Sequence, residues 1–303
     1  MRTVYLNGQF VPESEAKLSI YDLSVMQAAA AFEMTRSFNG THFRLVDHLD
    51  RLKQSCTLLS IEMPLTVTQL IDVCHDVSHH NDHGPGPGEE HRLLIVVSPG
   101  CAPMYKDLAG VIPHPFVYIA DFPLRYTVAG FSKYFTEGVH CVTSSIQQVP
   151  DACIPSAAKH RSRLHFHLAQ QQAPSGTWPI LTDKEGLVTE VPGANLASVK
   201  DGLIVTHEWN ALPGISMQTV KDLMPSFRST RMRQKDLLSQ DELWLTGTPF
   251  CMLPVVSLDG KPIGDGQIGP VYKETLAKWS KLVVMDIQEQ ICQWDLVASH
   301  SSI

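Results

Sequence analysis

Apolar residues along the first half of the chain follow the periods of strands and helices. Val4–Val11 alternates around Asn7-Gly8, which predicts a β-hairpin with a type I′ turn at the edge of a sheet. A helix with one apolar stripe is predicted where apolar residues recur at steps of four, three, four and three: Leu45, Leu49, Leu52, Cys56 and Leu59.

A second helix is predicted over Val67–Val77, because Thr66 and Gln69 have the spacing of a capping box. The run that follows is SHHNDHGPGPGEEH, and its glycines and prolines predict a loop. After this loop, Leu93–Ser98 is predicted to be a buried strand.

The chain is long enough for two domains, since it has 303 residues of which 44% are hydrophobic. Its pattern changes between about Ala120 and Gly130, after the strand-like run PFVYIAD. The sequence therefore predicts a small N-terminal domain over residues 1–122, a linker over residues 123–132 and a larger domain over residues 133–303.

The second half is expected to be mixed and rich in strands. A helix is predicted over about residues 158–172, and a short helix after Pro213-Gly214. Strands are predicted in or beside five segments: Ile180–Thr182, Leu187–Val191, Leu203–Thr206, Thr246–Thr248 and Leu253–Val256. In the tail, four apolar residues share one face: Leu276, Trp279, Val283 and Ile287.

Charge and composition narrow the classes of partner. The net charge is −7, and no run of Lys and Arg could neutralise many phosphates, so nucleic acid is not expected as a partner. The start MRTVYLNGQF lacks an apolar stretch and no window suits a membrane span, so a cytoplasmic location and no membrane partner are expected. The seven cysteines are scattered singly and are expected to be reduced thiols, mostly buried.

Histidines gather in two places, and neither predicts a metal site. His79, His80, His83 and His91 lie around one glycine-proline loop, which would hold ligands poorly, and their spacing fits no structural zinc pattern. A second group lies along the helix predicted over residues 158–172, where side chains two positions apart cannot share a face: His160, His165 and His167. No metal is therefore expected.

Four segments of the second half carry a stronger signal: IPSAAKHRSRLHFHLA, GLVTEVPGANLASVKDGLIVT, NALPGISMQTV and DELWLTGTPFCMLPVVSLDGKPIGDGQIGP. In the first half, AAAAFEMTRSFNGTHFRLVDHLDRLKQS runs from Phe32-Glu33 through an Arg to the first predicted helix. In this order the segments resemble the class IV aminotransferases, also called fold type IV pyridoxal phosphate enzymes. The resemblance covers nearly the whole chain.

The resemblance implies roles for particular residues. Lys159 would be the catalytic residue and would hold pyridoxal 5′-phosphate as a Schiff base, Glu190 would face the pyridine nitrogen, and Arg51 would bind the phosphate. Five further residues would contact the cofactor: Leu212, Ile215, Ser216, Gly247 and Thr248. These types suit the chemistry, because a sheltered amine attacks an aldehyde, and helix N-termini, hydroxyls and arginine bind a dianion.

Each of these residues also has an ordinary structural explanation. A lysine is more often solvated than catalytic, and a glutamate such as Glu190 is more often a surface carboxylate. Ser216 could be a plain helix cap. Arg51 could equally pair with Asp47, one turn earlier, in a surface ion pair of little worth.

Two features of many relatives are missing, and both concern the substrate. No Tyr follows Lys159 in the run KHRSRL, and VSPG stands where relatives with a substrate-carboxylate arginine have a pattern like TRG. Phe32 and four arginines are the candidates for substrate binding instead: Arg36, Arg125, Arg161 and Arg163.

The resemblance implies an α/β fold with a small N-terminal domain and a larger, strand-rich and barrel-like domain, assembled as a homodimer. The expected function is transfer of an amino group between a branched-chain or similar amino acid and a 2-oxo acid such as 2-oxoglutarate, with L or D stereochemistry left open. Two alternatives remain. One is a lyase resembling aminodeoxychorismate lyase, and the other is a non-catalytic binding module on the same fold.

Overall fold

The computed structural model describes residues 2–82 and 90–300, and its chain divides into two compact units. The first unit comprises Met1–Tyr126 and Ala158–Arg163, and the second comprises Thr127–Ala157 and Leu164–Ile303. The short segment Ala158–Arg163, which contains Lys159, thus groups with the N-terminal part of the chain. The sequence had placed it in the larger domain, and the linker over residues 123–132 stays a prediction.

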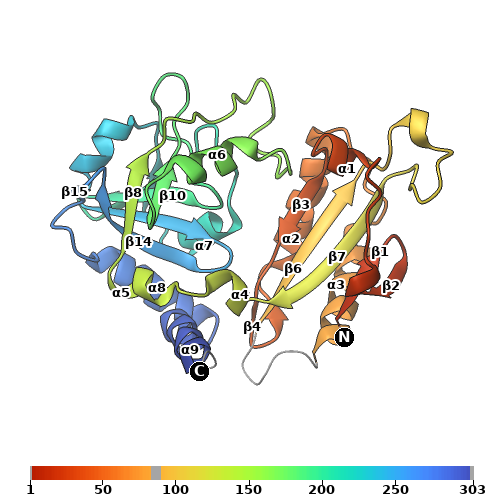
Figure 1. Ribbon diagram of the computed structural model, residues 1–303. Coiled ribbons are helices and arrows are strands. Elements are labelled where there is room, and N and C mark those ends of the chain that lie inside the picture. The colour runs from red at the N-terminus through yellow and green to blue at the C-terminus, as the bar shows by residue number, and fades with distance from the viewer. Residues whose placement is uncertain (1, 83–89, 301–303) are drawn as a thin grey trace. The chain divides into compact units, whose positions relative to one another are not determined.

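The first unit is built on a five-stranded antiparallel sheet with the order β2-β1-β7-β6-β3 (Figure 1). Its strands are β1 (Thr3–Leu6), β2 (Gln9–Pro12), β3 (Ala31–Met34), β6 (His91–Ser98) and β7 (Phe116–Pro123). The predicted hairpin is confirmed, because β1 and β2 pair around Asn7 and Gly8, whose φ angles are 48° and 87°. β2 lies at one edge of the sheet and β3 at the other.

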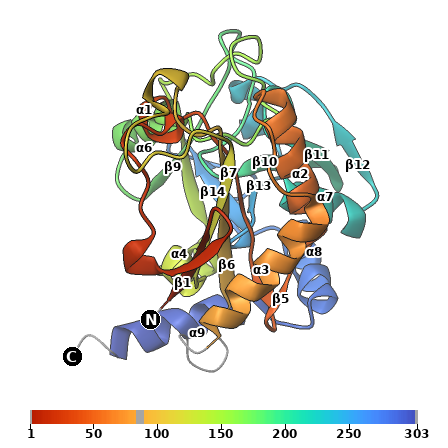
Figure 2. The ribbon, with the colours of Figure 1, turned by 90° about the vertical axis from the view of Figure 1, so that its right-hand side faces the viewer.

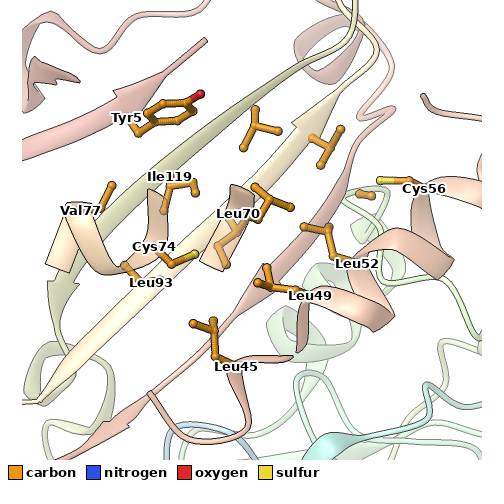
Figure 3. Packing of buried hydrophobic residues seen from close by; sticks show 14 of the residues in the cluster. Tyr5, Leu45, Leu49, Leu52, Cys56, Leu70, Cys74, Val77, Leu93 and Ile119 are labelled. Atoms are coloured by element: carbon orange, nitrogen blue, oxygen red, sulfur yellow. The ribbon is translucent and has the colours of Figure 1, made fainter. Parts of the chain in front are cut away.

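Two helices cover one face of this sheet, α2 (Leu45–Leu58) and α3 (Val67–Asn81) (Figure 2). The predicted stripe of α2 packs with Leu70 and Cys74 of α3 and with Leu93, Ile95 and Ile119 of the sheet (Figure 3). The predicted capping box of Thr66 and Gln69 is also present. However, α3 continues through residues 78–81, which the sequence had assigned to the loop, because Asn81 anchors this last turn to Thr3 of β1.

Shorter elements complete the first unit. They are η1 (Glu13–Glu15), α1 (Leu23–Met26), β4 (Ser37–Phe38), β5 (Thr41–His42) and η2 (Pro103–Tyr105), with β4 and β5 forming a separate two-stranded hairpin. The short α4 (Arg125–Val128) lies where the chain passes from the first unit to the second.

The second unit contains a mixed sheet with the order β12-β11-β10-β13-β14-β8-β9, to which β15 adds beside β14. Its strands are β8 (Val139–Thr143), β9 (Thr177–Ile180), β10 (Asn195–Lys200), β11 (Leu203–Thr206), β12 (Phe227–Ser229), β13 (Glu242–Gly247), β14 (Cys251–Leu258) and β15 (Lys261–Pro262). Leu187–Val191, predicted as a strand, forms only isolated bridges, for example between Thr182 and Val188.

Helices of the second unit pack on and around this sheet, and α7 and α8 both contact β13. They are α5 (Ser132–Thr136), α6 (Leu164–Gln172), α7 (Ile215–Leu223), η3 (Gln234–Ser239), α8 (Pro270–Leu282) and α9 (Ile287–His300). The helix expected after Pro213-Gly214 is confirmed as α7. The apolar face predicted in the tail is buried, but the chain breaks at Val284, whose φ is 52°, so two helices share it.

The helix predicted over residues 158–172 is wrong in its first six residues. α6 begins only at Leu164, and residues 159–161 pair with the outer edge of β3 around a bridge between His160 and Ala31. The N–H of Phe32 donates to the carbonyl of Lys159 (3.0 Å), and the N–H of Arg161 donates to the carbonyl of Ala30 (3.0 Å). These bonds satisfy backbone groups on the free edge of β3, which would otherwise lack partners in the sheet.

The cysteines agree with the prediction of reduced thiols that are mostly buried. All seven cysteines are free, and Cys153 and Cys292 are the two that are not buried. Within residues 2–82 and 90–300, no helix has the length and apolar character needed to cross a bilayer.

Candidate active site

Lys159 is held by the first unit through its main chain and its side chain. Its N–H donates to the hydroxyl of Ser55 in α2 (2.9 Å), and its carbonyl accepts from Phe32. The lysine Nζ lies 5.0 Å from the centre of the Phe32 ring, and the residue is half-buried. The lysine is therefore fixed beside β3 and α2 and is not a freely solvated side chain.

Arg51, the second predicted residue of this unit, is buried in an ion pair that the sequence did not reveal. Its Nε and Nη2 donate to the two carboxylate oxygens of Glu33 (2.6 and 2.9 Å), and His48 shares one of them (2.8 Å). The alternative pairing with Asp47 is wrong, because Asp47 pairs with Arg44. Glu33 projects from β3 toward α2, so an ion pair links the edge strand to this helix.

Burial and charge act in opposite directions on this cluster. Burial raises the pKa of Glu33, but Arg51 and His48 outweigh it and hold that pKa well below its usual range. For His48, burial lowers the pKa and outweighs the attraction of Glu33, with Arg51 and Lys159 lowering it further. Glu33 is therefore a carboxylate that balances Arg51, and His48 is neutral.

The opposite face of the first sheet gathers positive side chains around Phe32. The guanidinium carbons of Arg161 and Arg163 lie 4.4 and 5.6 Å from the centre of its ring. Burial raises the pKa of Tyr118, with Arg161 lowering it in part, so the phenol is neutral beside these cations. Phe32 packs with Ala30 and Val96 on this face.

Arg92 in β6 is a residue that the sequence reading missed. It is 7% exposed, and its Nη2 contacts the sulfur of Met34. Its Nε and Nη1 have no hydrogen-bond partner among the residues that the structure describes. Burial and the charge of Arg36 lower the pKa of Arg92 to about 9. Since buried guanidinium nitrogens without partners are costly, Arg92 is suited to binding an anion.

Arg36 is the predicted substrate residue that the structure places beside Arg92. It is 1% exposed, and its guanidinium stacks on Phe38, with 3.8 Å between the guanidinium carbon and the ring centre. Arg125 lies instead in α4 and stacks on Tyr126. In the sequence, Arg92 directly precedes the buried strand predicted over Leu93–Ser98. A buried arginine without a partner is rare, and this position was the signal that could have identified it.

In the second unit, Glu190 is buried and oriented by an amide. Its Oε1 accepts from the side chain of Gln148 (2.6 Å), which also donates to the carbonyl of Asn210 (3.3 Å). The side-chain amide of Asn210 donates to the carbonyl of Val149 (3.2 Å), which ties the two loops together. Glu190 is only 8% exposed, so the explanation as a surface carboxylate is wrong.

In the turn before α7, the main chain passes close to the side chain of Asn195. Asn195 donates its amide to the carbonyl of Leu212 (2.8 Å), and a Cβ on Gly214 would lie 1.9 Å from the Asn195 Oδ1. No side chain caps α7 at Gly214, so the first turn, with Ile215 and Ser216, presents main-chain N–H groups. Ser216 is therefore not the cap of this helix.

The end of β13 lies beside this turn, because Asn195 and Thr246 are opposite each other in the sheet. The hydroxyl of Thr246 is buried and has no hydrogen-bond partner within the described part of the chain. At Gly247, a Cβ would lie 2.7 Å from the Phe250 ring and 3.1 Å from the carbonyl of Gly193. Thr248 follows, half-buried, in the turn to β14.

The predicted residues thus fall into two groups, one in each unit. Lys159, Arg51, Phe32, Arg36, Arg161 and Arg163 belong to the first unit. Glu190, Leu212, Ile215, Ser216, Gly247 and Thr248 belong to the second, in the neighbouring turns that Asn195 links.

His91 and His160 each have contacts within the first unit. His91 contacts Asp121 and Asp82, whereas His160 pairs with Ala31 and so does not lie on α6 with His165 and His167. No cluster of potential metal ligands occurs in the described ranges 2–82 and 90–300, and His83 lies outside them.

The chain thus has a mixed α/β fold, with a sheltered lysine in its first unit and a buried glutamate and an uncapped helix N-terminus in its second. The sequence profile described as Amino-transferase class IV matches residues 30–258. The chain belongs to this family of class IV aminotransferases.

Individual relatives agree with this assignment. The branched-chain-amino-acid aminotransferase of Salmonella typhimurium is 28% identical over 287 residues, which cover 89% of each chain. The solved structure of the branched-chain amino acid aminotransferase from Escherichia coli superimposes with a TM-score of 0.83 at 25% identity, covering 93% of this chain and 94% of that one. The branched-chain aminotransferase of the archaeon Thermoproteus uzoniensis, solved with norvaline, has a TM-score of 0.81 at 26% identity, covering 97% and 98%.

These comparisons confirm the predicted family, fold class and enzyme class. The family profile spans the lysine segment, the glutamate and the two turns of the second unit. Other solved branched-chain amino acid aminotransferases of the same fold hold cofactor derivatives, namely N-(5′-phosphopyridoxyl)-L-glutamate and pyridoxamine 5′-phosphate.

Proposed function

We propose that this aminotransferase binds pyridoxal 5′-phosphate through Lys159 and the turns of its second unit. The donor set supports this. The first turn of α7 has no side-chain cap, and the Thr246 hydroxyl has no partner in the described ranges, so both can bind phosphate oxygens. Arg51 supplies the balancing positive charge, and Leu212, Ile215, Ser216, Gly247 and Thr248 line the cradle.

When bound, the cofactor supplies an electron sink for a carbanion beside a nitrogen atom. The Lys159 Nζ would hold the cofactor, and as a free amine it would move a proton between the α-carbon of the substrate and the neighbouring position. Glu190 would hold the cofactor at its pyridine nitrogen and keep that nitrogen protonated, and Gln148 orients its carboxylate. Glu33 and His48 hold Arg51 in place without a change of charge.

The substrates we propose are a branched-chain or similar amino acid and a dicarboxylic 2-oxo acid such as 2-oxoglutarate. Relatives of this size and fold carry the first name. The second is supported by Arg92 and Arg36, whose buried positive charges suit the extra carboxylate of a dicarboxylic acid. Phe32, with its cation neighbours Arg161 and Arg163, is the proposed apolar contact of the substrate.

The observation that carries the proposal is the sheltered position of Lys159, and the decisive experiment removes its amine. Lys159→Ala is expected to abolish the visible absorbance band that the wild-type protein shows after incubation with pyridoxal phosphate, together with transamination. Lys53→Ala, an exposed lysine on α2, serves as the control and should leave both unchanged. A band that survives in Lys159→Ala would refute the assignment.

The lyase alternative predicts a different product. An enzyme of that kind releases pyruvate from its substrate when no 2-oxo acid is added, whereas a transaminase converts only one equivalent of amino acid per cofactor. The named relatives are aminotransferases, which favours transamination. Coupled detection of pyruvate in a reaction without added 2-oxo acid separates the two.

A further inference from the structure

A closed chain of hydrogen bonds joins Lys159 to Arg51 within the first unit. The N–H of Lys159 donates to the Ser55 hydroxyl (2.9 Å), which donates to the carbonyl of Arg51 (2.8 Å). The Arg51 guanidinium donates to Glu33, whose neighbour in β3, Phe32, donates its N–H to the carbonyl of Lys159. The chain thus returns to the residue where it began.

Ser55 is the member of this chain with two simultaneous roles. A hydroxyl that donates to the carbonyl four residues earlier is common in helices, and α2 has another example in Thr57, which donates to Lys53 (3.1 Å). Thr275 in α8 does the same with Val271 (2.7 Å). Ser55 differs because its oxygen also accepts from a residue 104 positions away in sequence.

The consequence is a fixed spacing between two functional groups on different segments. Lys159 lies on an extended segment beyond the edge strand β3, and Arg51 lies on α2. Ser55 is fully buried, so water cannot replace its hydroxyl when that is removed. Loss of the hydroxyl would leave the Lys159 N–H without this acceptor and free the lysine main chain from α2.

We propose that Ser55 is a positioning residue, which fixes the main chain of Lys159 relative to Arg51 so that amine and guanidinium reach the same cofactor. This rests on the proposed function, because it assumes that Lys159 bears the cofactor and that Arg51 binds its phosphate. Glu33 is the second positioning residue of the chain, since it holds the guanidinium while Ser55 holds the backbone of the same arginine.

The test compares Ser55→Ala with the wild-type holoenzyme. The visible circular dichroism band of the bound cofactor is expected to lose about half its intensity, and the pH midpoint of its absorbance to move by about half a unit. The kcat should fall roughly tenfold to a hundredfold, with a smaller change in KM, because misplacement by a fraction of an ångström impairs proton transfer. Ser55→Thr, which keeps the hydroxyl, should restore most of the band and of kcat.

Thr275→Val is the matched control, since it removes an equally buried hydroxyl with the same helical bond and no link to Lys159. It should lower the melting temperature of the apoprotein by no more than Ser55→Ala does, and leave the cofactor spectrum unchanged. If Ser55→Ala does not fold, Ser55→Cys provides the same comparison, because a thiol is a weak acceptor.

Two results would count against these ideas in different ways. A Ser55→Ala holoenzyme with the wild-type band, pH midpoint and kcat would overturn the positioning role and leave the proposed function standing. A wild-type protein without a Lys159-dependent band would overturn the proposed function itself, and the positioning role with it.

Discussion

Two of the buried arginines of the first unit, Arg51 and Arg92, lie on opposite faces of one sheet and differ in their surroundings. Arg51 is 7% exposed and is paired with Glu33 and, through it, with His48. Arg92 is also 7% exposed, but its neighbour is another cation, Arg36, and two of its nitrogens have no partner in the described chain.

The difference is that the charge of Arg51 is neutralised by a carboxylate of the protein, whereas two nitrogens of Arg92 have no partner in the described chain. Desolvating a guanidinium costs several kcal/mol, and a carboxylate in good geometry recovers most of this cost, as Glu33 does for Arg51. Arg92 receives no such compensation from the described residues, so its cost is offset only when an anion binds. At equal burial, Arg51 thus has a carboxylate partner inside the protein, whereas two nitrogens of Arg92 have no partner in the described chain.

Removing Glu33, the partner of Arg51, should cause the largest loss of stability. Glu33→Ala is expected to lower the free energy of unfolding by about 3–5 kcal/mol, because it leaves a buried, uncompensated charge. The pKa of Glu33 is depressed below its ordinary 4.5, so this contribution is fully present above that pH and is lost as the pH falls. Urea denaturation at several pH values measures it.

The control is Asp47→Ala, which breaks the exposed pair with Arg44 on the same helix and should cost less than about 1 kcal/mol. Equal losses in the two variants would mean that the buried pair has no special weight. They would also remove the contrast with Arg92.

At Arg92, the substitution is expected to weaken substrate binding without lowering stability. Arg92→Met should raise the KM for 2-oxoglutarate roughly tenfold to a hundredfold, equivalent to about 1.4–2.8 kcal/mol, with a smaller effect on a monocarboxylic 2-oxo acid. Stability should be unchanged or improved, because an unsatisfied buried charge is replaced by an apolar side chain. Steady-state kinetics and thermal melts test both parts.

Arg228→Met, at an exposed arginine of β12, is the control and should change neither quantity. A large loss of stability in Arg92→Met, with unaltered KM, would mean that Arg92 stabilises the fold and does not bind the substrate.

The smallest of these effects concerns the second unit, where the proposed anion site is made of main chain and hydroxyls. Gly214→Ala places a methyl group against Asn195 and should weaken pyridoxal phosphate binding about tenfold, since the turn before α7 must shift. Gly269→Ala is a matched control, because Gly269 also precedes a helix and its Cβ would meet Glu242 in the same way. Both variants should lose similar stability, and only Gly214→Ala should lose cofactor affinity in an absorbance titration.

Should Gly269→Ala weaken cofactor binding as much as Gly214→Ala, the turn before α7 would have no specific part in the site. The anion would then be bound by side chains such as Arg51 alone.

Much of the local structure followed from the sequence because local forces decide it. The Asn7-Gly8 turn, the capping box of α3 and the stripe of α2 each depend on residues within a few positions of one another. The family resemblance similarly located Lys159 and Glu190, since their segments are contiguous. Both proved to be sheltered, as their proposed roles require.

Errors arose where distant segments compete for the same backbone. Residues 158–163 have a helical pattern, yet they pair with the free edge of β3, more than a hundred positions earlier. Residues 187–191 look like a strand but form only isolated bridges. Residues 159–161 found their partners far away in sequence, at Ala30 and Phe32, whereas residues 187–191 bond mainly to nearby turns, for example Thr189 to Leu181.

The sequence by itself determined the Asn7-Gly8 turn, the stripe of α2, the capping box of α3, the family and the identity of the candidate lysine, because these follow from short periodic patterns and contiguous motifs. Only the tertiary structure decided that Glu33 is the partner of Arg51, that Ser55 links it to Lys159 and that Arg92 lies buried beside Arg36. The reason is physical: the worth of a charge depends on what surrounds it once water is excluded, and those neighbours come from strands and helices far apart in the chain.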